Sequence, residues 1–243
     1  MKHTPLKTLL PLLLGSALLI GCNDSDSLVA DALAALPAAD TQSTATPADS
    51  ADSVTGDVSS LDLDALAQTV NALPIEALSA EEAASLQFMR EEEKLAHDVY
   101  VLAYSKWSQR MFTNIAASES SHTAAVKLLL ERYEIPDPAT GIPGEFTNPA
   151  LQAAYDVYTA RVQLSLVDAL LVGAEIEDLD IRDIEAEKAQ IDNADILTVY
   201  DHLLAGSRNH MRAFIRQLTA KGMTYTPQFI SQELFDAIIA EEV

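Results

Sequence analysis

The sequence predicts an all-α fold, and three observations lead to this class. Alanine and leucine are abundant while aromatic residues make up only 6% of the chain, a composition that favours helices over sheets. Apolar residues recur at three- and four-residue steps through four long stretches, which is the period of an amphipathic helix. A connection rich in proline and glycine, residues 134–149, separates these stretches into two pairs. We therefore expect a four-helix bundle with one long crossover connection.

Residues 1–21 are expected to be a signal peptide. Lys2 and Lys7 precede an apolar run at 9–20 that is too short for a comfortable membrane-spanning helix. The run ends in the letters LIGC, which resemble the lipobox of bacterial lipoproteins, where cleavage before the cysteine leaves its thiol to carry a diacylglycerol. The single cysteine of the chain, Cys22, lies at that boundary, so we expect lipidation there and a membrane anchor. An ordinary signal peptide with a chance cysteine is the alternative.

Residues 22–76 are expected to be a disordered linker between the lipid and a folded domain at 77–243. Asp, Ser, Ala and Thr dominate this segment and it has no aromatic residue, so it offers too little apolar surface to offset the entropy of ordering. Asn23 follows the cysteine where aspartate would be the inner-membrane signal. By similarity to enterobacterial sorting rules, this favours the outer membrane, facing the periplasm.

Each long helix carries an apolar stripe that polar residues interrupt. The interruptions are Glu93 in a helix at about 80–107, Glu119 and His122 at about 112–133, Glu177 at about 163–190, and Ser207 and His210 at about 195–221. A shorter helix is expected at 149–162, and a terminal helical turn after Pro227. Gly173, in mid-helix, costs about 1 kcal/mol against alanine and indicates a close approach or a bend.

These interruptions predict a metal site. A single Glu-x-x-His spacing often arises by chance, but interruptions at matching depth in four helices need another explanation. Buried carboxylates are costly unless they are paired or bind a metal. Carboxylate oxygens with imidazole nitrogens suit iron or manganese. We therefore expect three carboxylates and two histidines to converge in the core, namely Glu93, Glu119, His122, Glu177 and His210.

Four blocks of sequence resemble the bacterial and archaeal ferritin-like family DUF2202 over about residues 78–235. They read REEEKLAHDVY, SESSHTAAVKLLLERY, ALLVGAEIEDLDIRDI and VYDHLLAGSRNHMRAFIRQL. The resemblance implies a ferritin-like four-helix bundle, similar to bacterioferritin and rubrerythrin, in which Glu, Glu-x-x-His, Glu and Glu-x-x-His hold two metals. Carried onto this chain, it implies the five residues named above, with Glu175 as the alternative to Glu177. Tyr100 matches a tyrosine often found in such proteins.

Ser207 departs from the family pattern. The better-known relatives have a bridging glutamate where this chain has a serine. Two divalent ions carry four positive charges, and the remaining expected ligands supply three carboxylates. A dinuclear site, a single-metal site and a bundle that binds nothing therefore all stay open.

Other polar residues near the stripes are expected to lie at the surface. Glu91, Glu92 and Asp178 are expected to be solvated, His97 is favoured as surface, and Arg208 and Arg212 are expected to face solvent. Asp180 and Asp183 are placed near the end of the site, where they could orient a ligand histidine.

Two function classes remain for this chain. The first is a non-haem iron oxidoreductase that reacts with dioxygen or peroxide. Iron is the expected cofactor, with manganese as the alternative, and both one and two ions per chain stay open. The second is a non-catalytic scaffold or interaction module on the membrane. The formal net charge of −22 argues against a nucleic-acid backbone as partner, because phosphates would be repelled. The sequence leaves the substrate and oligomeric state open.

Overall fold

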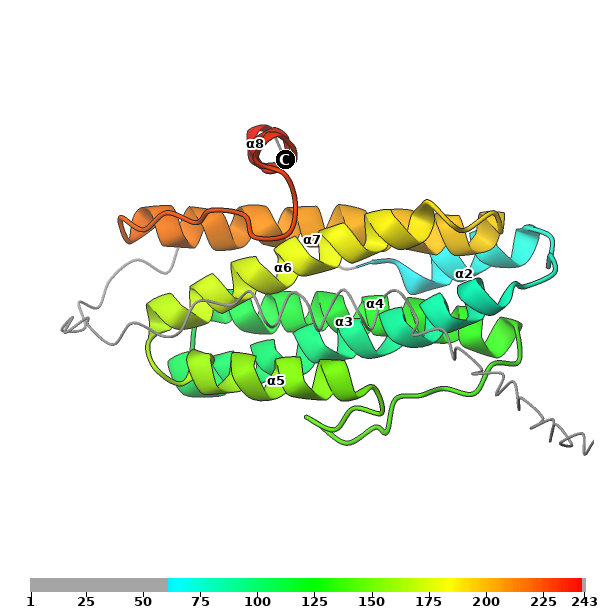
Figure 1. Cartoon of the computed structure of the whole chain (residues 1–243), viewed down its shortest axis with the longest axis horizontal. Helices are drawn as coiled ribbons and strands as arrows, with labels where there is room; N and C mark the ends of the chain where they lie inside the picture. The colour runs from blue at the N-terminus through cyan, green and yellow to red at the C-terminus, as the bar shows by residue number, and fades with distance from the viewer. Residues whose placement is uncertain (1–60, 242–243) are drawn as a thin grey trace, which may run out of the picture.

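The computed structural model describes residues 61–241, and this part of the chain is built of helices without a strand (Figure 1). The predicted all-α class is confirmed. The signal peptide at 1–21, Cys22 and the linker as far as residue 60 lie outside the described residues. The helices are α2 (Leu63–Ala72), α3 (Ala80–Trp107), α4 (Arg110–Arg132), α5 (Pro149–Val162), α6 (Leu166–Lys188), α7 (Ala194–Ala220) and α8 (Gln232–Ala240).

Four long helices, α3, α4, α6 and α7, form the bundle. α3 packs against α4 and α6 against α7, and the two pairs join through contacts of α3 with α6 and of α4 with α7 (Figure 1). The apolar stripes predicted from the sequence meet in this core, with Met89, Ile115, Ile181 and Leu203 all fully buried. None of the described helices is both long and apolar enough to cross a membrane.

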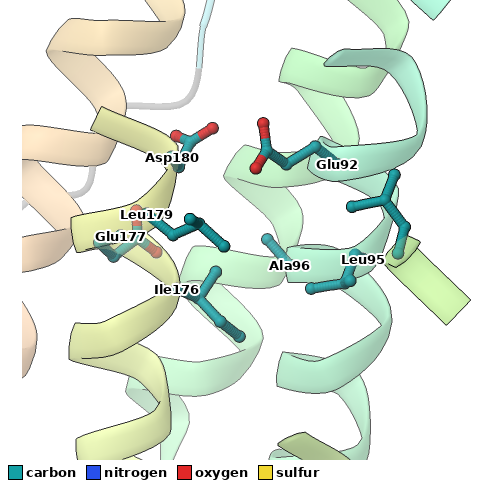
Figure 2. Close-up of a pocket in the computed structure, with 8 residues that line it drawn as sticks. Glu92, Leu95, Ala96, Ile176, Glu177, Leu179 and Asp180 are labelled. Carbon is teal, nitrogen blue, oxygen red and sulfur yellow. The ribbon is translucent and has the colours of Figure 1, made fainter. Parts of the chain in front are cut away.

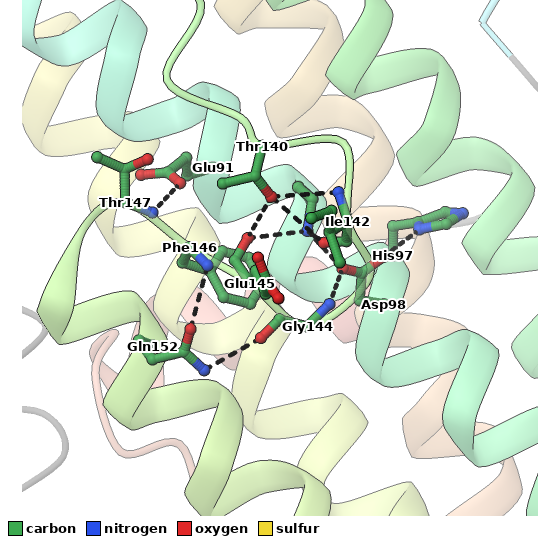
Figure 3. Close-up of polar contacts among 11 residues, drawn as sticks. Glu91, His97, Asp98, Thr140, Ile142, Gly144, Glu145, Phe146, Thr147 and Gln152 are labelled. Carbon is green, nitrogen blue, oxygen red and sulfur yellow. Dashed lines mark hydrogen bonds and ion pairs between the residues drawn. The ribbon is translucent and has the colours of Figure 1, made fainter.

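The crossover between α4 and α6 is fastened along α3 by carboxylates. Just before α5, Glu91 accepts a hydrogen bond from the backbone N–H of Thr147 at 2.6 Å (Figure 3). It accepts another from the backbone N–H of Asn148 at 2.9 Å. Asp98 accepts a hydrogen bond from the backbone N–H of Gly144 at 2.9 Å. The expectation that Glu91 is solvated is wrong, because these backbone groups need a buried acceptor.

The folded region begins earlier than the boundary expected at residue 77. α2 lies within the segment expected to be a disordered linker, and its Leu66 and Val70 are buried. α2 packs on α4 and α7 at one end of the bundle (Figure 1). Arg132 of α4 donates hydrogen bonds to the side chain of Asn71 and to the backbone carbonyl of Leu73. The apolar side chains four residues apart give this short helix one face to bury, despite its polar surroundings.

The C-terminal segment is held by Asp178 of α6, which is fully buried rather than solvated as expected. Its carboxylate accepts hydrogen bonds from the Tyr225 hydroxyl and from three successive backbone N–H groups at 228–230. Arg212, expected to face solvent, is also buried, and it donates to the backbone carbonyl of Ile238 in α8. The expected terminal turn is the helix α8, which packs on α7.

Candidate metal centre

The five residues predicted to converge do so in the middle of the bundle. α3 contributes Glu93, α4 contributes Glu119 and His122, α6 contributes Glu177 and α7 contributes His210, each at most 2% exposed. The three-residue step in α4 places its carboxylate and imidazole on one face of the helix. Leucine and isoleucine neighbours along each stripe bury that face, so the polar groups are enclosed with them.

The first group surrounds the Nδ1 atom of His122. Glu119 Oε2 lies 2.8 Å from this nitrogen and Glu93 Oε2 lies 3.2 Å from it. One ligand atom from each of the three residues lies within 4.8 Å of the others. Three donors this close together could hold one metal ion.

The second group surrounds the Nδ1 atom of His210. Glu119 Oε1 lies 2.9 Å from it and Glu177 Oε2 lies 3.5 Å from it. Glu119 therefore belongs to both groups, with one carboxylate oxygen facing each histidine. The two imidazole rings are stacked at 5.6 Å between centroids. The cluster has the form of two adjacent three-residue sites that share a carboxylate.

Contacts with other side chains show which of the two glutamates considered on α6, Glu177 or Glu175, belongs to the cluster. The first of these contacts is made by Tyr100. Its hydroxyl donates a 2.6 Å hydrogen bond to Glu177 Oε1, so this carboxylate is held with its other oxygen toward His210. Glu175 instead forms an ion pair with Arg161 of α5 at 2.8 Å. The structure thus brings Glu177 to the cluster and leaves Glu175 outside it.

Gly206 makes room for the His122 ring. A Cβ atom at this position would lie 2.4 Å from Cε1 of His122 and 2.5 Å from Nε2. The far side of the ring therefore packs directly against the backbone of α7, and Nδ1 is the ring nitrogen turned to the carboxylates. Gly173 makes room for the Phe214 ring in the same way, because a Cβ there would lie 2.1 Å from a ring carbon of Phe214. The close approach expected at Gly173 is confirmed.

For each residue of the cluster, burial and pairing with opposite charges shift the pKa in opposite directions. Burial raises the pKa of Glu93 to about 7, against the attraction of His122. Burial also acts to raise the pKa of Glu119, but His210 and His122 together hold it well below its usual range. Burial disfavours protonated histidine, yet Glu119 and Glu177 raise the pKa of His210 to about 10. The pKa of His122 is likewise raised well above its ordinary value by Glu93 and Glu119.

Ser207 and Asp180 form a contact that the sequence did not reveal. The Ser207 hydroxyl, which has one donor hydrogen, lies within hydrogen-bond distance of both Asp180 Oδ2 and the backbone carbonyl oxygen of Leu203. Asp180 was expected near the end of the site, and it lines the same cavity as Glu177. Burial together with the charges of Glu93 and Glu177 raises the pKa of Asp180 well above the ordinary value. The helical period of α6 places Asp180 one turn beyond Glu177, which was the available signal.

A small cavity opens beside the cluster, between α3, α5 and α6 (Figure 2). Apolar side chains form most of its wall, and three carboxyl groups join them. The lining residues are Glu92, Leu95, Ala96, Leu151, Ile176, Glu177, Leu179 and Asp180. The space open to the centre of a water-sized sphere is about 10 Å³, about what one water molecule requires. Glu92 is buried here, so the expectation that it is solvated is wrong.

The donors that the cluster presents fit a metal ion of the iron or manganese type. Oxygen and imidazole nitrogen ligands suit these metals. Glu93 Oε1 and His210 Nε2 are buried, and neither has a hydrogen-bond partner among the described residues. Buried polar groups usually have partners, so such atoms call for an explanation, and an unplaced ion is one.

The fold and the cluster define a class: a helical-bundle protein with a buried carboxylate–histidine cluster that could hold a metal ion. The chain belongs to the family described as "Uncharacterized protein domain (DUF2202)", whose model matches residues 82–242. The membership expected from the four sequence blocks is thus confirmed.

A relative and a solved structure agree with this assignment. The chain is 51% identical over 172 residues to "Uncharacterized protein MJ0754" of Methanocaldococcus jannaschii, which covers 70% of this chain and 93% of the relative. The crystal structure of hypothetical protein MJ0754 from that archaeon matches with a TM-score of 0.69 and 51% identity. That match covers 70% of this chain and 98% of the solved chain.

Proposed function

We propose that this protein is a ferritin-like, metal-binding lipoprotein of the bacterial cell envelope whose bundle holds two iron ions per chain. Manganese is the alternative metal. The observation that carries the proposal is the position of Glu119, which offers one oxygen to each of the two three-residue groups. A carboxylate shared in this way is the usual ligand between paired metals in helical bundles.

A bound iron pair would supply electrons to dioxygen or peroxide, the reaction class we propose for this centre. The residues of the chain provide the binding site and its surroundings. Histidines that are protonated without metal neutralise the carboxylates and must release their protons when metal binds. Tyr100 orients Glu177 through its hydrogen bond. The cavity beside Glu177 gives a very small molecule space next to the cluster.

The envelope location is a proposal from the lipobox-like letters that end at Cys22. A diacylglycerol there would anchor the chain to a membrane, and Asn23 favours the outer membrane. Labelling with a radioactive fatty acid tests the anchor: the full-length chain should carry the label, and Cys22→Ser should lose it. A labelled Cys22→Ser variant would contradict the anchor without bearing on the metal centre.

A second candidate is a scaffold that binds no metal. The observation in its favour is that both histidines already face carboxylates at 2.8–3.5 Å. Protonated histidines would balance part of the buried negative charge in such a scaffold. Metal content separates the two candidates directly.

The first experiment counts ions bound to the purified full-length chain after loading with ferrous iron without oxygen and removal of loose metal. We expect about two ions per chain. Glu119→Gln should lose both, since this residue belongs to both groups, whereas Glu93→Gln should lose one. Glu175→Gln is the matched control and should retain two, because Glu175 pairs with Arg161 outside the cluster.

A folded wild-type chain without bound iron would overturn the proposal and favour the scaffold. The loaded protein is then mixed with dioxygen or with peroxide, and oxidation of the iron is followed by absorbance. Oxidation faster than that of free ferrous iron supports the proposed reaction. Oxidation no faster than in the Glu119→Gln sample would leave a metal-binding protein without this activity.

A further inference from the structure

The expected ligands of a two-ion centre include only three carboxylates, Glu93, Glu119 and Glu177. The resemblance to bacterioferritin and rubrerythrin implies a fourth at position 207, where this chain has serine. We propose that Asp180 of α6 supplies this carboxylate to the metal pair and that Ser207 of α7 positions it. This inference rests on the proposed function, because it names a further ligand of the same centre.

The contact between α6 and α7 carries the inference. Asp180 Oδ2 accepts a hydrogen bond from the Ser207 hydroxyl. Ser207 Oγ also lies 2.9 Å from the backbone carbonyl oxygen of Leu203, one turn earlier, which places the hydroxyl on the core face of α7. The carboxyl group thus reaches from the neighbouring helix to the place where a glutamate side chain would begin. A serine is small enough to leave that space open.

One carboxylate oxygen of Asp180 is buried without a hydrogen-bond partner among the described residues. This oxygen is Oδ1, and the residue as a whole is 6% exposed. Its carboxyl group lines the cavity beside Glu177 and points toward Glu92 across it (Figure 2). Neither three-residue group includes Asp180, so Asp180 would be an additional ligand, brought in when the ions bind.

The charges of the cluster agree with a fourth ligand. Glu93, Glu119 and Glu177 supply three negative charges when ionised, and two divalent ions carry four positive charges. Asp180 brings the total to four. Burial first, and then the charges of Glu93 and Glu177, raise the pKa of Asp180 in the metal-free protein. Cations placed among these groups would favour its ionised form instead.

The test measures binding of manganese ions to the full-length protein, because manganese stays divalent in air and the readout does not depend on activity. Bound ions per chain are counted after gel filtration, and affinities are measured by calorimetry. The wild type should bind about two ions. Asp180→Asn, which keeps the shape of the side chain, should bind one, or bind the second at least about tenfold more weakly. Glu175→Gln should behave as the wild type.

Two further variants test the placement. Ser207→Ala removes the positioning hydroxyl and should weaken the second ion by less than Asp180→Asn does. The exchange Asp180→Ser with Ser207→Glu moves the carboxylate to α7 and should restore two ions. Circular dichroism establishes which variants fold, and if the exchange does not, the comparison of Asp180→Asn with wild type decides.

The outcomes separate the inference from the function beneath it. Two ions bound with unchanged affinity by Asp180→Asn would overturn the role of Asp180 and leave the proposed function intact. One ion in both wild type and Asp180→Asn would also overturn it. A folded wild type that binds no manganese and no iron would overturn the proposed function together with this inference.

Discussion

At the scale of single residues, the cluster depends on a glycine that offers no ligand. The His122 ring occupies the space where a Cβ of residue 206 would stand. We predict that Gly206→Ala lowers the free energy of unfolding by about 1–3 kcal/mol through overpacking. It should also cost the ion of the His122 group, because the ring must move away from Glu119. Urea denaturation and metal counting measure the two effects.

A double-mutant cycle shows whether the effect of Gly206→Ala passes through His122. In a His122→Ala background the space is free, so the added methyl group should be neutral or should stabilise the helix by up to about 1 kcal/mol. An equal loss of stability in both backgrounds would contradict this account and place the cause in the backbone of α7.

The sequence could predict five cluster residues because each interrupts an apolar stripe of helical period. It could not predict Asp180 or Glu92 in the same way. Each lies next to the stripe, and whether such a position faces the core depends on the rotation of α6 and α3 about their axes. That rotation follows from packing between helices, which a single sequence does not contain. The sequence placed Ser207 on the apolar stripe of its helix, but it did not predict the hydrogen bond with Asp180.

At the scale of elements, Glu91 connects the crossover to α3 by accepting two backbone N–H groups just before α5. We predict that Glu91→Gln lowers the free energy of unfolding by about 1–3 kcal/mol, because the amide NH₂ would face one of those N–H groups and leave it unpaired. Thermal and urea denaturation measure the change. Glu76→Gln, at an exposed position, is the matched control, and an equal loss there would contradict the prediction.

The long helices were predictable within a few residues because their apolar patterns continue over many turns. At the start of α3, Ser79 and Glu82 also form a capping box. α2 was missed because its composition resembles the polar segment before it. Its two buried side chains, Leu66 and Val70, stabilise the helix only because they pack on α4 and α7. Whether such a short segment is helical therefore depends on contacts with distant parts of the chain.

At the scale of the whole molecule, the buried cluster makes stability depend on pH. The pKa of His210 is raised from 6.5 to about 10, and that of Glu93 from 4.5 to about 7. In both cases the folded state holds its proton more strongly than the unfolded chain. These contributions to stability are present at low pH and are lost as pH rises through the folded values. The metal-free protein should therefore lose stability between about pH 5 and pH 10.

Urea denaturation across this range, with a metal chelator present, measures the slope. His210→Gln should flatten its upper part, while His202→Gln, at an exposed position, should leave it unchanged. Excess manganese should oppose the loss increasingly as pH rises, because metal and protons compete for the same ligands. Stability that rises with pH in the metal-free protein would contradict the protonation assigned to the cluster.

The attachment of α2 would have a mechanical consequence if Cys22 carries the proposed lipid. Tension arriving through the residues before 61 reaches α2 before it reaches α3. α2 buries two side chains, whereas α3 is buried along most of its length. Under such a load the short helix should therefore detach first, while the ligand-bearing helices keep their positions. A pull from the proposed anchor would then displace α2 before it distorts the centre.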